Sequence, residues 1–124
     1  MIAGIGVDLV PVAQMRDSAD DLVFLQYAFT QTERNYASSR GDESECLAGI
    51  FAAKEAVTKA LAPLSHGNEL DTKDIEILHA EKGAPYIAKR DSLSAFMDAH
   101  DVREVHVSVS HDGDYAIAFA IAES

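Results

Sequence analysis

Three side chains in the sequence have types and positions suited to chemistry on a phosphate group. Asp8 closes a glycine-rich segment of alternating residues, Glu55 lies within a long helical pattern, and His111 precedes a turn. Two carboxylates suit a hard cation such as Mg²⁺, which prefers oxygen ligands and is commonly shared with substrate phosphates. If the predicted elements bring the three residues together, the pattern favours phosphoryl-type chemistry over a closed structural metal site.

Each of these residues also has an ordinary structural explanation. Asp8 can organise the turn into Pro11, and Glu55 can pair with Lys59 one helical turn later. His111 lies in a His-Asp-Gly-Asp segment, and Asp-Gly is a strong hairpin-turn signal. Both interpretations stay open when the residues are considered one at a time.

The composition predicts one domain, spanning 1–124, and argues against several classes of partner. The 124 residues carry 10 Lys and Arg against 21 Asp and Glu, a formal net charge of −11, whereas nucleic acid and anionic membranes require a basic surface. No segment is apolar over the length of a membrane span, and the amino terminus lacks a signal-peptide pattern. Cys46 has no partner for an internal disulfide. We therefore expect a cytoplasmic protein without nucleic-acid or membrane partners.

Helical spacing and capping signals predict four helices: 12–29, 31–39, 43–62 and a short helix capped by Asp91. The second begins with a capping box from Thr30 to Glu33. The helix at 43–62 carries a stripe of large apolar residues and, beside it, a ridge of alanines at every fourth position. Lys54 lies within the large apolar stripe, so its charge needs a partner in the folded chain.

Alternation of apolar residues predicts five strands, which lie at 2–10, 74–79, 84–89, 105–110 and 116–122. The last strand is bulky on one face and entirely alanine on the other, and an alanine face lets another element approach closely. Its expected partner is the alanine ridge of the long helix. The predicted fold class is α+β, with a mainly antiparallel sheet packed against a long central helix.

Three motifs change the interpretation when they are considered together: Gly4-Ile5-Gly6-Val7-Asp8, Phe51-Ala52-Ala53-Lys54-Glu55-Ala56 and Val107-Ser108-Val109-Ser110-His111-Asp112. In order and spacing they resemble the small 4′-phosphopantetheinyl transferases of the holo-acyl-carrier-protein synthase type, across essentially the whole chain. The resemblance implies a Mg²⁺-dependent enzyme. Such an enzyme moves the 4′-phosphopantetheine arm of coenzyme A to a serine of an apo acyl-carrier protein and releases adenosine 3′,5′-bisphosphate.

The resemblance also implies catalytic and metal-binding roles by position. Asp8 and Glu55 would hold Mg²⁺ against the pyrophosphate of coenzyme A, where the cation offsets developing charge. The acceptor of the serine proton stays open between Glu55, a metal-bound water, and His111 with Asp112 beside it. A route through Glu55 and water is the preferred interpretation.

The resemblance assigns coenzyme contacts to five residues: Lys59, Gly83, Pro85, Ser110 and His111. Lys59 would contact the pyrophosphate, and the turn at Gly83 would let the backbone approach the adenine. Two cations that many relatives place near the nucleotide are missing here, because Ile50 and Ala84 stand at their positions. The candidates to replace them are Lys82, Arg90 and Arg103.

The partner is expected to be an apo acyl-carrier protein or a carrier domain of a type I fatty-acid synthase. Relatives present a basic first helix to acidic carriers, but the segment 11–25 holds one arginine against three aspartates. This charge favours a less acidic carrier domain, or docking through apolar residues, for which the candidates are Met15, Leu22 and Phe29.

The resemblance further implies a homotrimer with coenzyme sites between subunits, and a central helix apolar on two sides fits such an assembly. Two other functions are kept open. The first is a non-catalytic trimeric module that binds a nucleotide or acyl-coenzyme A. The second is hydrolysis of the coenzyme's pyrophosphate without a carrier.

Overall fold

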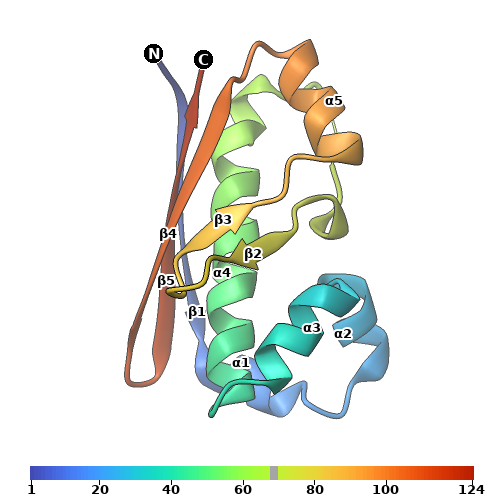
Figure 1. Ribbon diagram of the computed structural model, residues 1–124, viewed down its shortest axis with the longest axis vertical. Helices are drawn as coiled ribbons and strands as arrows, with labels where there is room; N and C mark the ends of the chain where they lie inside the picture. The colour runs from blue at the N-terminus through green and yellow to red at the C-terminus, as the bar shows by residue number, and fades with distance from the viewer. Residues whose placement is uncertain (68–69) are drawn as a thin grey trace.

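A three-stranded antiparallel sheet lies along one side of a long central helix in the computed structural model, which describes residues 1–67 and 70–124 (Figure 1). The long helix, α4, spans Glu43–Leu61. The sheet has the order β1-β5-β4, and its strands are β1 (Ile2–Pro11), β4 (Glu104–Asp112) and β5 (Tyr115–Glu123). The predicted α+β class and the packing of helix on sheet are confirmed.

Small residues set the distance between the sheet and α4. On β1, a Cβ atom at Gly4 or Gly6 would collide with the carbonyl oxygens of Ala60 and Ala56. The inner face of β5 is built from four fully buried alanines, at 116, 118, 120 and 122. The predicted approach of alanine face to alanine ridge is therefore confirmed, and it holds β1 and β5 close to the helix.

Shorter elements cover the side of α4 that faces away from the sheet (Figure 1). They are α1 (Val12–Asp17), α2 (Leu22–Ala28), α3 (Gln31–Ser38), β2 (Ile77–His79), β3 (Pro85–Ile87) and α5 (Asp91–Ala99), with 3₁₀ turns at Ala62–Leu64 and Thr72–Asp74. β2 and β3 form an antiparallel hairpin. None of the helices in the described part of the chain is long and apolar enough to cross a membrane.

Two of the predicted helices differ from those observed. The helix expected at 12–29 is two helices, because the chain turns at 18–21 and Asp21 then caps α2 by accepting a hydrogen bond from the amide of Phe24 at 3.1 Å. Asp91 does not cap α5. It has a φ of 51° and follows Arg90, which occupies the cap position without a side-chain hydrogen bond.

The predicted strands 74–79 and 84–89 are also shorter than expected. The first is cut back to Ile77–His79 because Thr72–Asp74 forms a 3₁₀ turn, and the second is cut back to Pro85–Ile87. The turn between them has Gly83 at φ 92°, in the left-handed region that favours glycine. The hairpin itself is therefore confirmed, with shorter arms.

Lys54 pairs with Glu33 inside the protein, which supplies the partner that its charge was expected to need. Its Nζ lies 2.6 Å from Glu33 Oε1, and both side chains are fully buried. Glu33 also accepts hydrogen bonds from the amides of Thr30 and Ile77, each at 2.8 Å. Burial raises the pKa of Glu33 and lowers that of Lys54. The pair ties α3 and β2 to the middle of α4.

Candidate functional site

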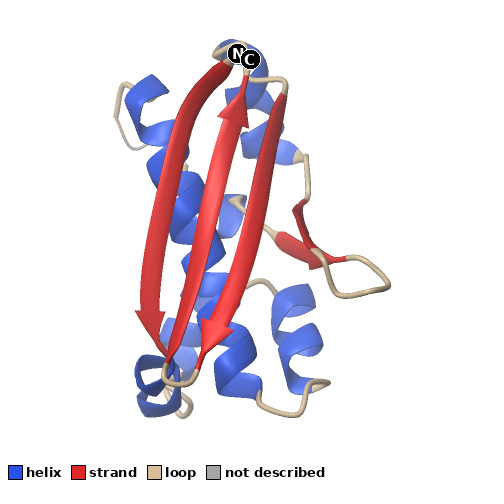
Figure 2. Ribbon diagram, turned by 90° about the vertical axis from the view of Figure 1, so that its left-hand side faces the viewer, coloured by secondary structure: helices blue, strands red, loops and turns tan. Residues whose placement is uncertain are grey.

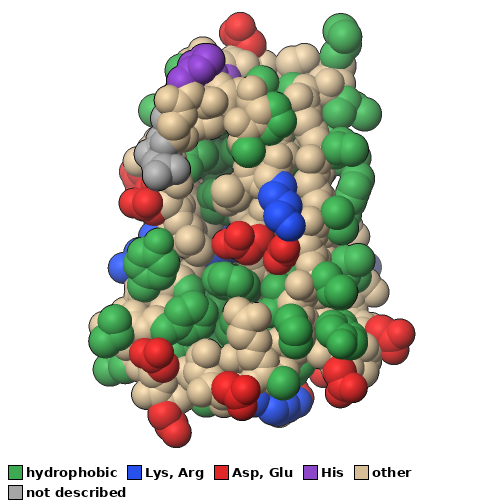
Figure 3. Space-filling view, turned by 180° about the vertical axis from the view of Figure 1, so that it is seen from behind, with side chains coloured by type: hydrophobic (Ala, Val, Ile, Leu, Met, Phe, Trp, Pro, Cys, Tyr) green, Lys and Arg blue, Asp and Glu red, His purple; other side chains and the backbone are tan. Residues whose placement is uncertain are grey.

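Asp8, Glu55 and Lys59 come together where β1 passes along α4. Asp8 lies opposite Ala118 in the pairing of β1 with β5. Lys59 Nζ donates to Asp8 Oδ1 at 2.8 Å and to the carbonyl of Val7 at 3.1 Å. Glu55 is one helical turn before Lys59, so the two share a side of α4. On the face turned away from Figure 1, acidic and basic side chains lie side by side near the centre (Figure 3).

The charges of this cluster act on one another. Burial raises the pKa of Glu55, the neighbouring Asp8 raises it further, and Lys59 partly offsets both. The hydrogen bond to Asp8 raises the pKa of Lys59. A carboxyl group with a raised pKa, beside a second carboxylate and an ammonium group, is suited to accept a proton or to share a cation.

This cluster contains two side chains that could bind a metal ion, the carboxylates of Asp8 and Glu55. Within 1–67 and 70–124, no group of three or more His, Cys, Asp or Glu side chains is placed to hold a metal ion. A closed structural site therefore does not fit these residues. Two carboxylates do fit Mg²⁺, which usually keeps several waters and shares substrate phosphates with one or two protein carboxylates.

His111 lies at the other edge of the sheet from Asp8. It stands on β4 opposite Ala116 of β5, and since β5 separates β4 from β1, two strand spacings, about 10 Å, lie between the two edges. His111 Nε2 is 3.0 Å from the carbonyl oxygen of Glu45. It also packs over Gly49, where a Cβ would come within 2.8 Å of Nε2. One chain thus brings Asp8 and Glu55 together and leaves His111 apart from them.

A cavity of about 390 Å³ opens beside His111, between β4, the β2-β3 hairpin and the start of α4. Gly83, Pro85 and His111, three of the five residues expected to contact the coenzyme, line it together. Lys59 does not line the cavity, since its ammonium is bonded to Asp8. The cavity and the Asp8 cluster are therefore two separate parts of the expected site.

Ser110 and Asp112 lie outside this cavity. Ser110 borders a hollow of about 230 Å³ that also contains Leu9 and Ile117, both exposed. Asp112 is exposed at the end of β4. The coenzyme contact of Ser110 and the part of Asp112 in proton transfer stay predictions.

None of the three candidates to replace the missing cations, Lys82, Arg90 and Arg103, lines this cavity. Arg90 pairs with Glu76 at 2.7 Å and Arg103 with Glu123 at 3.1 Å. The wall of the cavity instead contains Ile50 and three residues that sequence reasoning missed, Tyr36, Arg40 and His79. No spacing rule links these three, because they come from α3, the loop after it and β2.

Comparison with known proteins finds relatives over nearly the whole chain. The family model of the 4′-phosphopantetheinyl transferase superfamily matches residues 4–120. The holo-[acyl-carrier-protein] synthase of Halothermothrix orenii is 38% identical over 125 residues, which cover 99% of this chain and 98% of that protein. That of Clostridium perfringens strain SM101 is 38% identical over 128 residues, covering 99% and 95%.

Solved structures show the same fold. The holo-[acyl-carrier-protein] synthase of Neisseria meningitidis superposes with a TM-score of 0.88 at 30% identity, and the match covers 100% of both chains. That of Helicobacter pylori, in complex with coenzyme A, gives a TM-score of 0.82 at 32% identity, over 96% of this chain and 99% of that one. The fold is thus that of a phosphopantetheinyl transferase, and the chain belongs to the 4′-phosphopantetheinyl transferase superfamily. Its resemblance to the holo-acyl-carrier-protein synthases, expected from three motifs, is confirmed.

Proposed function

We propose that this protein transfers the 4′-phosphopantetheine group of coenzyme A to a serine hydroxyl of an apo acyl-carrier protein or carrier domain. The serine oxygen bonds to the phosphorus that carries the pantetheine arm. The bond from that phosphorus to the bridging oxygen breaks, and adenosine 3′,5′-bisphosphate leaves. The observation that carries the proposal is the joint placement of Asp8, Glu55 and Lys59 in a chain that the family model matches, because Asp8 and Glu55 come from two of the three motifs on which the resemblance rests.

Asp8 and Glu55 are the residues that would hold Mg²⁺. When bound, Mg²⁺ supplies positive charge that offsets the charge developing on the pyrophosphate. Lys59 adds a second positive charge on the same side of α4, where its ammonium is held beside Asp8 and about half of its side chain is exposed. Its part is to bind phosphate oxygens as a point charge.

The serine proton goes to Glu55, directly or through a water. The raised pKa of Glu55 supports this assignment, because a general base works best when its pKa lies closer to the working pH. His111 with Asp112 is the alternative base. Its Nε2 donates to the carbonyl of Glu45, so on this route Nδ1 would accept the proton.

We further propose a homotrimer with sites between subunits. A coenzyme that contacts both the Asp8 cluster and the His111 cavity has to reach opposite edges of the sheet, and a neighbouring subunit can supply the second part. The outer face of the sheet is uncovered (Figure 2), and it exposes five large apolar residues: Ile5, Val7, Leu9, Ile117 and Phe119. The two apolar sides of α4 do not support the trimer, because one chain buries both.

The acceptor that we propose is a carrier of low acidity, such as a carrier domain of a type I fatty-acid synthase. Met15 and Phe29 are core residues, with 1% and 2% of their surface exposed, so they cannot dock a partner. Leu22 is exposed, as are Val23 and Tyr27 on the same helix α2. Aspartates at 17, 20 and 21 border this apolar surface, and they would repel an acidic carrier.

The test is mass spectrometry of apo carriers incubated with this protein, coenzyme A and Mg²⁺. A free-standing acidic carrier and a type I carrier domain are run in parallel. We expect a mass gain equal to the phosphopantetheine arm, faster on the carrier domain and lost with EDTA. Glu55→Gln should remove turnover, whereas Asp98→Asn, an exposed carboxylate on α5, should not.

Other outcomes would replace the proposal. The protein is a binding module if coenzyme A binds but neither carrier gains mass, and if Glu55→Gln leaves the binding of coenzyme A unchanged. If coenzyme A is consumed without a carrier, the reaction is hydrolysis. Equal rates on both carriers would refute only the proposed preference for a carrier of low acidity. Since the donor and acceptor both belong to intracellular metabolism, we place the reaction in the cytoplasm.

A further inference from the structure

A buried ion pair lies next in sequence to Glu55, and no step of the proposed reaction uses it. Lys54 directly precedes Glu55 on α4, and its ammonium is bonded to the carboxylate of Glu33. The same ammonium donates to the carbonyl oxygen of Thr72 at 3.2 Å and lies 5.7 Å from the centre of the Phe29 ring. Three other segments of the chain therefore hold one point on the side of α4 that faces away from the sheet (Figure 1).

Hydrogen bonds fix the carboxylate of Glu33 independently of the ammonium. Its Oε1 accepts from the amide of Thr30 and its Oε2 from the amide of Ile77, each at 2.8 Å. The Thr30 hydroxyl donates in turn to Glu76 Oε2 at 2.6 Å, and Arg90 pairs with Oε1 of that buried carboxylate at 2.7 Å. Both buried carboxylates thus have fixed partners, and Glu33 presents an oxygen to α4 at a defined position.

The opposite side of α4 offers little that could fix the rotation of the helix. It packs on the glycines of β1 and on the buried alanine face of β5. Packed helices are oriented by side chains that interlock as ridges and grooves, and glycine and alanine form only shallow ones. This surface sets the distance between helix and sheet but resists small rotations weakly. A hydrogen-bonded ion pair is directional, so it can supply the missing restraint.

We propose that Glu33 and Lys54 are positioning residues of the transfer reaction, because their buried pair fixes the rotation of α4 and with it the direction in which Glu55 faces Asp8. The inference rests on the proposed function, in which these two acidic residues share Mg²⁺. A side-chain tip lies about 5 Å from the axis of its helix, so a rotation of about 10° displaces the Glu55 carboxylate by about 1 Å. A misplacement of that size reduces turnover by about 100-fold.

The test separates position from stability with a double variant, Lys54→Met with Glu33→Gln, in which neither charge is left buried and unpaired. Transfer to an apo carrier domain is followed by mass spectrometry below the Tm of every variant. The affinity for Mg²⁺ is measured by isothermal titration calorimetry with coenzyme A present and the carrier absent.

We expect the double variant to be more stable than Lys54→Met alone and still slow. Its kcat should be lower than that of the wild type by about 100-fold, and its affinity for Mg²⁺ by about 10-fold. The control is Leu93→Ala, which destabilises the core from α5, where Leu93 is fully buried. It should lower the Tm and leave kcat and the affinity for Mg²⁺ close to the wild-type values.

The outcomes separate this inference from the proposed function. If the wild type neither transfers the arm nor binds Mg²⁺, the proposed function fails and the inference fails with it. If the wild type is active and kcat of the double variant recovers in step with its Tm, only the inference is overturned. It is also overturned if Leu93→Ala lowers kcat and the affinity for Mg²⁺ as much as the double variant does.

A second variant keeps the inference testable if the double variant does not fold. Glu33→Asp retains both charges and draws the carboxylate back from Lys54 by one methylene group. It should fold and still lower kcat, because the pair can then form only if α4 shifts. An unchanged kcat in Glu33→Asp would overturn the inference.

Discussion

Removal of the Lys54 ammonium is expected to destabilise the protein strongly. Lys54→Met fits an apolar side chain into the same space but leaves the Glu33 carboxylate fully buried without its cation. Breaking a buried ion pair in this way costs about 3 to 5 kcal/mol, a large share of the roughly 5 to 15 kcal/mol that stabilises a typical domain. With 124 residues and about 2.1 cal/mol/K of unfolding entropy per residue, the Tm falls by about 12 to 19 °C.

The pH dependence of this variant provides a second measurement. Burial raises the pKa of Glu33, and Lys54 lowers it, so the substitution leaves the upward shift less opposed. A carboxyl whose pKa is higher in the folded state stabilises the fold below its unfolded pKa, and this contribution is lost as pH rises through the folded value. The difference in Tm between wild type and Lys54→Met should therefore be smaller at pH 5 than at pH 8.

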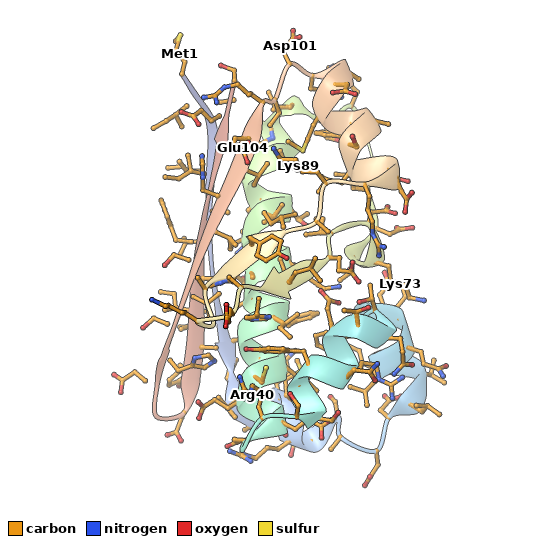
Figure 4. The ribbon with its side chains drawn as sticks, viewed as in Figure 1. Met1, Arg40, Lys73, Lys89, Asp101 and Glu104 are labelled. Atoms are coloured by element: carbon orange, nitrogen blue, oxygen red, sulfur yellow. The ribbon has the colours of Figure 1, made fainter. Side chains whose placement is uncertain are left out.

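The assay is thermal unfolding followed by circular dichroism, at one protein concentration because an oligomer's Tm depends on it. The control is Lys89→Met, which breaks the exposed pair with Glu104, where the side chains are 44% and 36% exposed (Figure 4). Such a pair contributes about 1 kcal/mol or less. Glu33→Gln combined with Lys54→Met should regain part of the lost Tm. A loss from Lys54→Met no larger than the control's, at either pH, would refute the reasoning.

Three further predictions concern other parts of the molecule. Burial raises the pKa of Cys46 to about 11, so its thiol should react with Ellman's reagent at pH 8 far more slowly than free cysteine; an equal rate would contradict this. Gly6→Ala should lower stability by about 1 to 3 kcal/mol in chemical denaturation, because the added Cβ collides with the backbone of α4; Gly41→Ala, in open space, is the neutral control. Phe119→Asp should give monomers in light scattering if the outer sheet face is the subunit contact, whereas Val23→Asp on α2 should not; an unchanged assembly would place the contact elsewhere.

The sheet and its packing on α4 could be predicted because the pattern is local. Alternation in β1 and β5 identifies the strands, and the alanine face of β5 can pack closely only against another surface of small residues. The capping box of α3 was found for the same reason, since Thr30 and Glu33 are three residues apart. The break between α1 and α2 was missed because its aspartates also suit a solvated helix start.

The site could be predicted only in part, because strand order is a long-range property. The sequence grouped Asp8, Glu55 and His111, and the order β1-β5-β4 separates the first two from the third. Arg40 and His79 meet Tyr36 through the packing of the β2-β3 hairpin beside α3. No sequence spacing predicts that contact.

Lys54 and Glu55 are adjacent in the sequence, and the structure gives them linked roles. Successive residues of a helix differ by about 100° around its axis, so Lys54 faces α3 and β2 while Glu55 faces the side of β1. The buried pair with Glu33 holds α4 against rotation from one side, and Gly6 allows β1 to press on it from the other. These two constraints together fix the direction in which Glu55 points relative to Asp8. A change at Lys54 that spares the fold should therefore still reduce turnover, because it loosens the helix that positions the two carboxylates.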